Sequence, residues 1–314
     1  MKALITGVAG FIGSTLANRL TTDGVTVVGL DSLTDYYELE LKQQNLAALT
    51  SPLFSFHRGD INAVDLDALL NDVDVIFHLA GQPGVRGSWG DGFDAYVDAN
   101  INATQRVLEA VRRSAHRPKV VYASSSSIYG EAESYPTGES VTPRPRSPYG
   151  VTKLAGEHLC RLYSANDGLR TVSLRFFTVY GPKQRPDMAF TRFLRAAVEG
   201  TTIGVYGSGE QVRDFTFVDD IVNALVLAAR TDVTPGSVYN VSGGGSHSIN
   251  EVLEMIAEIS PRALKIERSA VAKGDVSRTA ADITAITRDL GWAPTVQLRD
   301  GLERQLAWVQ ASAE

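Results

Sequence analysis

The stretch that decides the fold is "TGVAGFIGS", residues 6–14. Its glycines, Gly7, Gly10 and Gly13, directly follow an apolar run that predicts a strand, and they open a segment with the pattern of a helix. Glycine at such a strand-to-helix turn permits a tight bend and lets backbone N–H groups at the helix N-terminus approach a pyrophosphate. The spacing is G-x-x-G-x-x-G rather than the better known G-x-G-x-x-G, so the interpretation depends on what surrounds the turn.

Apolar runs alternate with helical patterns through the first half of the chain. The runs that predict strands after the first lie at 25–31, 54–61, 74–81, 118–127 and 169–177. Helical patterns lie between them, the longest at 93–114 and 149–167. Strands of nearly continuous apolar residues, separated by helices, favour a parallel sheet that is covered on both faces. The sequence therefore predicts an α/β fold, a doubly wound parallel sheet of the Rossmann type.

The second predicted strand ends in Asp31, and this acid sharpens the interpretation of the glycine-rich turn. A carboxylate there accepts hydrogen bonds from an adenosine ribose and repels a 2′-phosphate, so the sequence predicts NAD rather than NADP. Later strands end on the same edge of the sheet, where a ligand at a switch point lies. We expect the cofactor to contact Gly7, Gly10, Phe11, Ile12, Gly13, Asp31, Ser32, Asp60, Ile61, Leu79, Ala80 and Gly81. The alternative is an ordinary glycine-rich turn beside a solvated aspartate.

The rhythm changes after Phe177, where short helices and strand-and-turn segments follow without a repeat or a low-complexity linker. The first of these segments, 178–187, reads as a loop. Glycine-rich 242–248 lacks the ending of a P-loop and reads as a surface turn before a helix. We predict an NAD-binding domain of residues 1–177 with a return of about 217–241, and an interwoven α/β substrate lobe of residues 178–216 and 242–314.

Composition limits the partners. The 314 residues carry a formal net charge of −6 and show no run of Lys or Arg, which disfavours nucleic acid. The single cysteine cannot form an internal disulfide, and no Cys/His cluster has the spacing of a metal site. No signal peptide precedes the first strand, and no apolar segment has the length of a membrane span. We therefore expect a cytoplasmic protein with no metal and no membrane partner.

Tyr149 and Lys153 form a Tyr-x-x-x-Lys pattern at the start of the helix after the fifth strand. A spacing of four places both side chains on one helical face. A nearby ammonium, with the positive nicotinamide of NAD⁺, favours the tyrosinate and so gives a base near neutral pH. Alone, the pattern equally fits a buried tyrosine beside a solvated lysine. It follows the serine-rich strand end "YASSSSIYG", residues 122–130, in a chain with a dinucleotide turn, and that combination favours catalysis.

These motifs resemble those of the extended short-chain dehydrogenase/reductase superfamily, and within it the nucleotide-sugar epimerases and dehydratases. The resemblance runs over nearly the whole chain, through "TGVAGFIG", "SSSSIYG", "SPYGVTK", "RDFTFVDDIVNAL" and "GDVSRTAAD". It implies a tightly held NAD and a UDP-sugar or related substrate. It also implies a catalytic hydroxyl, tyrosine and lysine, which match Ser125, Tyr149 and Lys153; the last two would contact NAD as well.

The implied reaction is a reversible oxidation that consumes no external electron acceptor. Tyr149 takes the proton of the sugar's 4-hydroxyl with the help of Ser125 while NAD⁺ oxidises the carbon. The 4-keto sugar then turns in the pocket. Reduction at its other face inverts the carbon.

The two positions after Ser125 distinguish the reaction classes of this family. Dehydratases carry an Asp-Glu pair after their catalytic threonine, and UDP-glucuronate decarboxylases carry a glutamate; these positions are Ser126 and Ser127 here. A dehydratase needs a general acid to expel the 6-hydroxyl, and a serine cannot replace it effectively. The missing acids argue against 4,6-dehydration, and less strongly against decarboxylation.

The segment "RFFTVYGPKQRPDMAF", residues 175–190, resembles the UDP-glucuronate 4-epimerases, as do "DSLTDYYELELK" at 31–42 and "GQPGVRGSW" at 81–89. UDP-galactose 4-epimerases typically have asparagine at the position of Thr178. The resemblance implies a site for the sugar and its carboxylate that comprises Ser125, Ser126, Ser127, Tyr149, Thr178, Arg185 and Met188. Neutral hydroxyls and one guanidinium satisfy a carboxylate without the repulsion that a glutamate would add. Alternatively, Arg185 binds a phosphate or lies in solvent.

The segment "GVYGSGEQVRDF", residues 204–215, matches the family's nucleotide-binding segment. Tyr206 would pack on the uracil and Arg213 would pair with the diphosphate, which suits a bidentate fork. Asp275 stands where the family has an acid for the nucleotide ribose. The residues before it, "AVAK" at 270–273, lack the arginine or glutamine of other patterns, which leaves the choice of nucleotide open. Arg86 is a phosphate contact, a carboxylate contact or a surface residue.

The sequence thus favours an NAD-dependent UDP-glucuronate 4-epimerase that forms UDP-galacturonate. UDP-glucose 4-epimerase and UDP-glucuronate decarboxylase stay open as alternatives. A non-catalytic NAD-binding regulator is a third, against which the presence of both Tyr149 and Lys153 argues. Family members usually dimerise through the helices that here span about 95–113 and 149–166, so we expect a homodimer.

Overall fold

The computed structural model describes residues 1–270 and 274–312. Its centre is a parallel sheet of seven strands in the order β10-β6-β5-β4-β1-β2-β3. The strands are β1 (Lys2–Thr6), β2 (Thr26–Asp31), β3 (Phe54–Arg58), β4 (Val75–His78), β5 (Lys119–Ser125), β6 (Thr171–Phe176) and β10 (Ser237–Val241). The doubly wound parallel sheet that the sequence predicts is confirmed. Because the strand order reverses between β1 and β4, their carboxyl ends form a switch point, the usual place for a ligand in such sheets.

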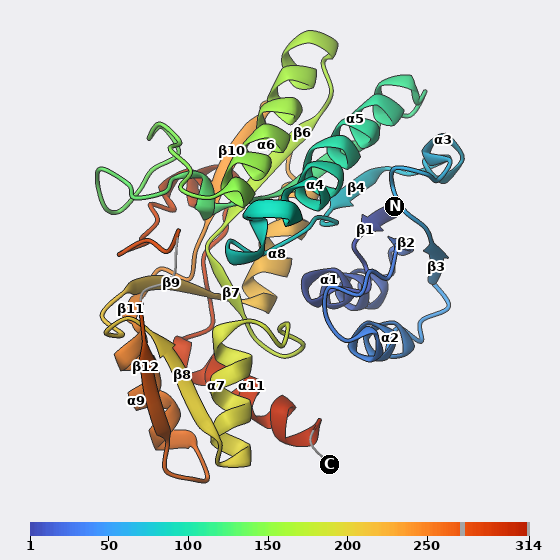
Figure 1. The fold of residues 1–314 in the computed structure, drawn as a ribbon. Helices are drawn as coiled ribbons and strands as arrows, with labels where there is room; N and C mark the ends of the chain where they lie inside the picture. Colours follow the sequence, from blue (N-terminus) through green and yellow to red (C-terminus); the bar gives the residue numbers. More distant parts are fainter. Residues whose placement is uncertain (271–273, 313–314) are drawn as a thin grey trace.

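Helices cover both faces of this sheet (Figure 1). On one face α1 (Phe11–Thr22) packs against α8 (Val218–Arg230), and on the other α5 (Ala103–Arg113) packs against α6 (Pro148–Asp167). Neighbouring residues of β5 enter different cores: Val121 joins the core beneath α1 and α8, whereas Val120 joins the core beneath α5 and α6. Burial on both faces explains why the central strands read as continuous apolar runs, whereas β3 at the edge is largely exposed. The shorter helices here are α2 (Leu39–Ala47) and α3 (Leu66–Leu69).

The helix predicted over 93–114 is interrupted. It consists of α4 (Phe93–Tyr96), a π-helical segment at Val97–Asn102, and α5. Such π turns insert one residue into a helix and occur often at functional sites. Here the segment carries Asn100, whose side chain reaches across to the loop after β4.

The remaining strands form two small sheets, drawn at the lower left of Figure 1. One contains β7 (Thr178–Tyr180), β9 (Val212–Phe217) and β11 (Ser246–Ser248), and the other pairs β8 (Thr202–Tyr206) with β12 (Lys265–Ser269). Around them pack α7 (Ala189–Glu199), α9 (Ile249–Ile259) and α11 (Leu298–Ala311), while α10 (Thr284–Leu290) lies against β10. Within the described residues, no helix is both long enough and apolar enough to cross a membrane.

Two segments that the sequence analysis treats as irregular contribute strands. The predicted loop 178–187 begins with β7, which pairs with β9. The predicted turn 242–248 ends in β11, which pairs antiparallel with β9, and its last residue, Ser248, forms a capping box with Glu251 at the start of α9. Three-residue strands of this kind leave too short a pattern to recognise in the sequence.

Candidate active site

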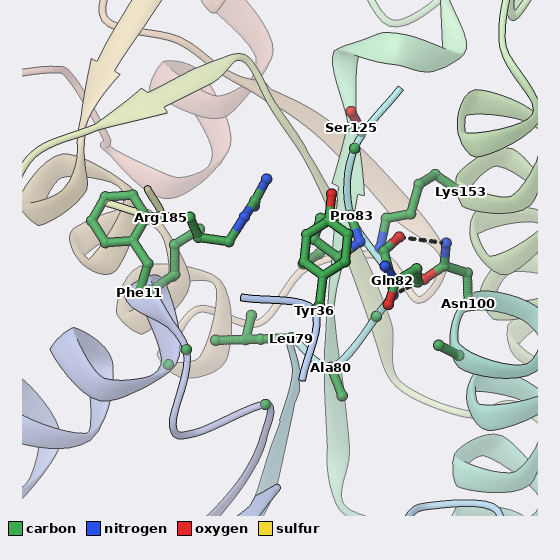
Figure 2. A pocket seen from close by; sticks show the side chains of 18 of the residues that line it. Phe11, Tyr36, Leu79, Ala80, Gln82, Pro83, Asn100, Ser125, Lys153 and Arg185 are labelled. Carbon is green, nitrogen blue, oxygen red and sulfur yellow. Dashed lines mark hydrogen bonds between the residues drawn. The ribbon is translucent and has the colours of Figure 1, made fainter. Parts of the chain in front are cut away.

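A cavity of about 450 Å³ runs along the carboxyl ends of the central strands, and Figure 2 shows some of the residues that line it. Its walls contain every residue that the sequence predicts for the cofactor: Gly7, Gly10, Phe11, Ile12, Gly13, Asp31, Ser32, Asp60, Ile61, Leu79, Ala80, Gly81, Tyr149 and Lys153. The predicted sugar residues Ser125, Ser126, Ser127, Thr178, Arg185 and Met188 line it as well. The structure therefore brings both sets together at the switch point. The contact of each residue with a ligand stays a prediction.

The glycine-rich turn opens the N-terminus of α1 to this cavity. Gly7 has a φ of +73°, and a Cβ there would lie 2.8 Å from the backbone nitrogen of Ala80. A Cβ on Gly13 would lie 2.2 Å from the carbonyl oxygen of Gly7. In the described chain no side chain caps α1 at Gly10, and its first turn contains no acid. These N–H groups and the positive end of the helix dipole suit a pyrophosphate, so the turn fits NAD.

Asp31 is fixed at the end of β2 by two backbone hydrogen bonds. Its Oδ2 accepts from Ala9 N at 3.0 Å, and its Oδ1 accepts from Leu33 N at 2.8 Å. The carboxylate thus joins the glycine-rich turn to the loop that follows β2. Carboxylate oxygens have further lone pairs, so Asp31 can still accept from the hydroxyls of a ribose.

The start of α6 places the predicted catalytic pair. Ser147 caps the helix, its Oγ accepting from Gly150 N at 3.1 Å, and Pro148 occupies the first helical position. Tyr149 then lies in the first turn and Lys153 one turn later, and both side chains face the cavity. The ammonium of Lys153 lies 4.8 Å from the ring centroid of Tyr122 on β5.

Burial dominates the ionisation of both groups. It raises the pKa of the Tyr149 phenol above 10.0, while the hydrogen bond with Ser125 and the positive charge of Arg185 act in the opposite direction. Burial also lowers the pKa of Lys153 to about 8. The sequence predicts a tyrosinate near neutral pH. In the protein without cofactor, however, the pKa of Tyr149 is high, because desolvation outweighs the effects of Ser125 and Arg185. The positive charge of the NAD⁺ nicotinamide, which the sequence argument also invoked, would lower the pKa of Tyr149 further once the cofactor is bound.

The four consecutive serines divide between two environments. Ser124 lies in the interior, where its Oγ donates to Glu157 Oε2 at 2.8 Å. Ser125 ends β5, and its Oγ accepts from Ser127 N at 3.1 Å. Ser126 and Ser127 form a short 3₁₀ turn that lines the cavity. All four serines line the cavity, but the Ser124 hydroxyl is engaged by Glu157 and so serves the scaffold, while the next three hydroxyls are assigned to the site.

A buried ion pair that the sequence analysis missed lies behind the serines. Arg175 Nη2 lies 2.6 Å from Glu157 Oε1, and their side chains are 3% and 1% exposed. Arg175 also donates to the hydroxyl of Tyr129 at 2.6 Å, and that hydroxyl donates to Asn240 Oδ1 at 2.7 Å. The available signal was a single charge in the apolar strand "TVSLRF", which a buried strand tolerates only when the charge is paired.

Two further polar side chains at the site carry no recognisable motif. Asn100 accepts from Gln82 N at 2.8 Å and donates to Gln82 O at 3.1 Å, the pair of dashed lines in Figure 2. It thereby fixes the loop after β4, which borders the cavity. Tyr36 lies across the sugar end of the cavity, near Gly84 and Arg185. Tyr36 belongs to a stretch that the sequence analysis compared with a subfamily, but nothing in the pattern marks its position.

A second cavity, of about 390 Å³, continues from the first at Tyr36, Ser126, Ser127, Thr178 and Met188. It contains the residues predicted for the nucleotide, namely Tyr206, Arg213 and Asp275, together with Arg86, for which the sequence left three roles open. Arg86 already stacks on Tyr206, with the guanidinium 3.9 Å from the ring centroid, and Arg213 forms an ion pair with Asp275. A uracil on that face of Tyr206 would have to displace Arg86. Residues 271–273 of the "AVAK" segment lie outside the described residues.

Comparisons with known proteins agree with this geometry. The family model described as the NAD dependent epimerase/dehydratase family matches residues 3–242. A UDP-glucuronic acid 4-epimerase from Bacillus cereus, solved in complex with UDP-glucuronic acid and NAD, is 42% identical and superposes with a TM-score of 0.96, covering 99% of this chain and 100% of the other.

Relatives known by sequence carry two different substrate names. An uncharacterised UDP-glucose epimerase of Bacillus subtilis (strain 168) is 41% identical over 99% of this chain and 98% of its own length. A UDP-glucuronate 4-epimerase of Thermodesulfobacterium geofontis (strain OPF15) is 36% identical over 99% of this chain and 97% of its own.

The fold and the site together define a dinucleotide-dependent enzyme of the α/β class. The chain belongs to the NAD dependent epimerase/dehydratase family, since the family model covers more than half of it. The resemblance inferred from the motifs and the prediction of NAD are both confirmed.

Proposed function

We propose that the protein interconverts UDP-glucuronate and UDP-galacturonate by NAD-dependent inversion at C4. The observation that carries the proposal is the composition of the sugar end of the cavity. Ser126 and Ser127 stand there in place of acids, and Thr178 and Arg185 face the same space. Hydroxyls and a guanidinium are donors for a carboxylate, whereas a glutamate would repel it. The relatives from B. cereus and T. geofontis support the same substrate.

The mechanism assigns each step of proton handling to the chain's own residues. Bound NAD⁺ supplies the reversible oxidation and reduction at the sugar carbon. Tyr149 takes the proton of the 4-hydroxyl and returns it, since its phenol faces the cavity and a hydrogen bond with Ser125 favours its ionisation. Lys153, one helical turn away, holds the nicotinamide ribose and adds positive charge. The 4-keto sugar has to rotate between the two half-reactions, and neutral hydroxyls hold its carboxylate without fixing it as a second charge would.

The glycine-rich turn and Asp31 hold the cofactor at the other end of the same cavity. Phe11 and Ile12 supply N–H groups for the pyrophosphate from the first turn of α1. Asp31 accepts from the adenosine ribose, and its negative charge excludes NADP. The sheet of seven strands thus binds NAD, and the lobe of 178–216 and 242–314 binds the UDP moiety through Tyr206, Arg213 and Asp275 in the second cavity.

UDP-glucose 4-epimerase is the second candidate, and the name of the B. subtilis relative favours it. Thr178 and Arg185 argue for a carboxylate instead. A decarboxylase is less well supported, because no glutamate follows Ser125. A regulator that only binds NAD is disfavoured because both Tyr149 and Lys153 line the cavity.

The protein acts as a cytoplasmic homodimer in this proposal. The exposed side chains of Val151 and Leu162 leave apolar surface on α6, 48% and 53% exposed. A second copy that packs its own α5 and α6 against this face would cover them. Sedimentation at micromolar concentration tests the dimer, and a monomer there would contradict it.

The experiment for the function is product identification. UDP-glucuronate is incubated with the protein, without added reductant or oxidant, and the sugar product is followed by proton NMR. We expect UDP-galacturonate at equilibrium with the substrate and no UDP-pentose. Tyr149→Phe, which keeps the ring but removes the base, is the matched control and should give no product. Conversion to UDP-pentose would instead establish the decarboxylase.

A further inference from the structure

At the sugar end of the cavity, the guanidinium of Arg185 forms a bidentate ion pair with Asp187 through its Nε side. Arg185 Nε donates to Asp187 Oδ1 at 2.9 Å, and Nη2 donates to Oδ2 at 3.0 Å. The two side chains differ in exposure: that of Arg185 is 18% exposed and that of Asp187 is 43% exposed. Arg185 lines the first cavity and Asp187 lines the second. The acid therefore holds the guanidinium from the nucleotide side while the guanidinium faces the sugar side.

This fork leaves a defined set of donors for a ligand. A guanidinium has five N–H groups in one plane, and the fork uses the one on Nε and one on Nη2. Both N–H groups of Nη1 and the second N–H of Nη2 remain, and two of them form the end-on edge of the group. An end-on edge presents two parallel donors, the geometry that a second carboxylate accepts.

The backbone beside Arg185 is fixed independently of the fork. Gln184, 3% exposed, donates to Val179 O at 2.9 Å and accepts from Gln305 Nε2 on α11 at 2.9 Å. Gln305 in turn accepts from Gly181 N at 2.9 Å. The loop is therefore held by buried amides on both sides. What the backbone leaves free is the rotation of the Arg185 side chain, and Asp187 is the group that sets it.

Neighbouring side chains limit the orientations that the Arg185 guanidinium can adopt. The guanidinium carbon of Arg185 lies 5.8 Å from the ring centroid of Tyr36, which covers it from the loop after β2. Figure 2 shows Arg185 extending toward Tyr36. Tyr36 also approaches Gly84, where a Cβ would lie 2.6 Å from the Tyr36 hydroxyl. Arg185, Tyr36 and the serine turn line the same cavity, so the donors that the fork leaves free have access to the space between them.

We propose that Asp187 is a positioning residue that selects for a carboxylate on the sugar. It turns the Arg185 guanidinium so that its end-on edge faces the sugar's C6 group, and the substrate carboxylate completes a carboxylate–guanidinium–carboxylate arrangement. A substrate with a CH₂OH group at C6 cannot form the bidentate pair with the end-on donors of Arg185, so its binding does not depend on Asp187. This inference rests on the proposed function and adds to it the residue that sets its specificity.

The test compares two substrates that differ only at C6. Asp187→Ala and Asp187→Asn are assayed with UDP-glucuronate and UDP-glucose, as NAD-loaded protein, for KM and kcat. For Asp187→Ala we expect the KM for UDP-glucuronate to rise about tenfold or more, as for a lost charge-assisted hydrogen bond, with the kinetics on UDP-glucose unchanged within about twofold. Asp187→Asn keeps one acceptor for Nε and should lie between the wild type and Asp187→Ala.

The matched control is the other arginine–aspartate pair of the cleft. Asp275 pairs with Arg213 in the second cavity, where the nucleotide of either substrate would lie. Asp275→Ala should therefore impair both substrates alike. Equal losses for both substrates in Asp187→Ala would show that Asp187 only supports the loop, and an unchanged or lowered KM for UDP-glucuronate would show that it does not orient the donor; either result overturns the inference. Failure of the proposed function is separate, since it appears as absent turnover of UDP-glucuronate by the wild type.

Discussion

Two arginine–carboxylate pairs lie on either side of the serine turn, and they differ in what their donors do. In the first pair, Arg175 and Glu157 are both almost fully buried, and Arg175 also donates to Tyr129 and to the carbonyl oxygen of Glu139. In the second pair, the Arg185 side chain is largely buried, at 18% exposed, whereas Asp187 is exposed, and the fork uses only two donors of the guanidinium. A nearly saturated pair, in which Arg175 uses four of its five N–H donors, holds a scaffold, whereas a pair with free donors at a cavity is able to bind a ligand.

The largest effect is expected from breaking the nearly saturated pair. Arg175→Met leaves Glu157 buried without its partner, which should lower the free energy of unfolding by about 3–5 kcal/mol. Urea denaturation measures this. The matched double variant, Arg175→Met with Glu157→Leu, removes both charges and should recover most of the loss. A cost below about 1 kcal/mol for the single variant would mean that the pair is not what stabilises this region.

Lys153 extends the comparison of the two ion pairs, since its ammonium is buried and no salt bridge of the described residues includes it. Burial lowers the pKa of Lys153 from the ordinary 10.5 to about 8, so at pH 7 the charged lysine costs the folded state on the order of 3 kcal/mol. Compared in NAD-free form, Lys153→Met should therefore be more stable than the wild type at pH 7, although the NAD-loaded variant should be inactive. The cost exists only while the lysine is protonated in the unfolded state, so the difference should shrink as the pH rises from 8 to 10.5. Thermal unfolding that shows the variant less stable at pH 7 contradicts this.

Arg185→Met tests the open pair. It removes the donors that face the sugar but leaves Asp187 exposed to solvent, so stability should change little. The specificity constant for UDP-glucuronate should fall by about 10- to 150-fold, or 1.5–3 kcal/mol, because hydrogen bonds to a charged group are lost. Steady-state kinetics and urea denaturation together check it. A large loss of stability would place Arg185 with Arg175, as scaffold.

The smallest effect concerns Ser127. We expect its hydroxyl to keep the substrate carboxylate solvated by donors, which disfavours the loss of carbon dioxide from the 4-keto sugar. Ser127→Ala should release measurable UDP-pentose beside the normal product, detected by NMR or mass spectrometry. Ser124→Ala is the control, since Ser124 also lines the cavity but its hydroxyl donates to Glu157. If Ser127→Ala releases no more UDP-pentose than the wild type, Ser127 does not protect the substrate from decarboxylation.

The contrast between the two ion pairs also shows which features of the fold and the site can be predicted from the sequence. Glycines at a turn and an acid at a strand end act through the backbone and one strand, so Gly7, Gly10, Gly13 and Asp31 are recognisable from local spacing. Strands buried on both faces read directly as apolar runs, which made the sheet predictable.

What could not be predicted depends on contacts across the chain. The partner of Arg175 is 18 residues away, on α6, and the link between Gln184 and Gln305 joins the loop after β7 to α11. Neither leaves a periodic signal. The π turn that presents Asn100 and the three-residue strands β7 and β11 are likewise set by tertiary packing rather than by local propensity.

The most direct measurement of the central claim is the ratio of specificity constants for UDP-glucuronate and UDP-glucose with the wild-type, NAD-loaded protein. The two substrates differ only in the group that the serine turn, Thr178 and Arg185 are proposed to read. The account predicts that UDP-glucuronate is preferred by about 100-fold, the size of one or two hydrogen bonds between charged groups. Equal or better turnover of UDP-glucose would contradict it, because the donors at the sugar end would then not select for a carboxylate.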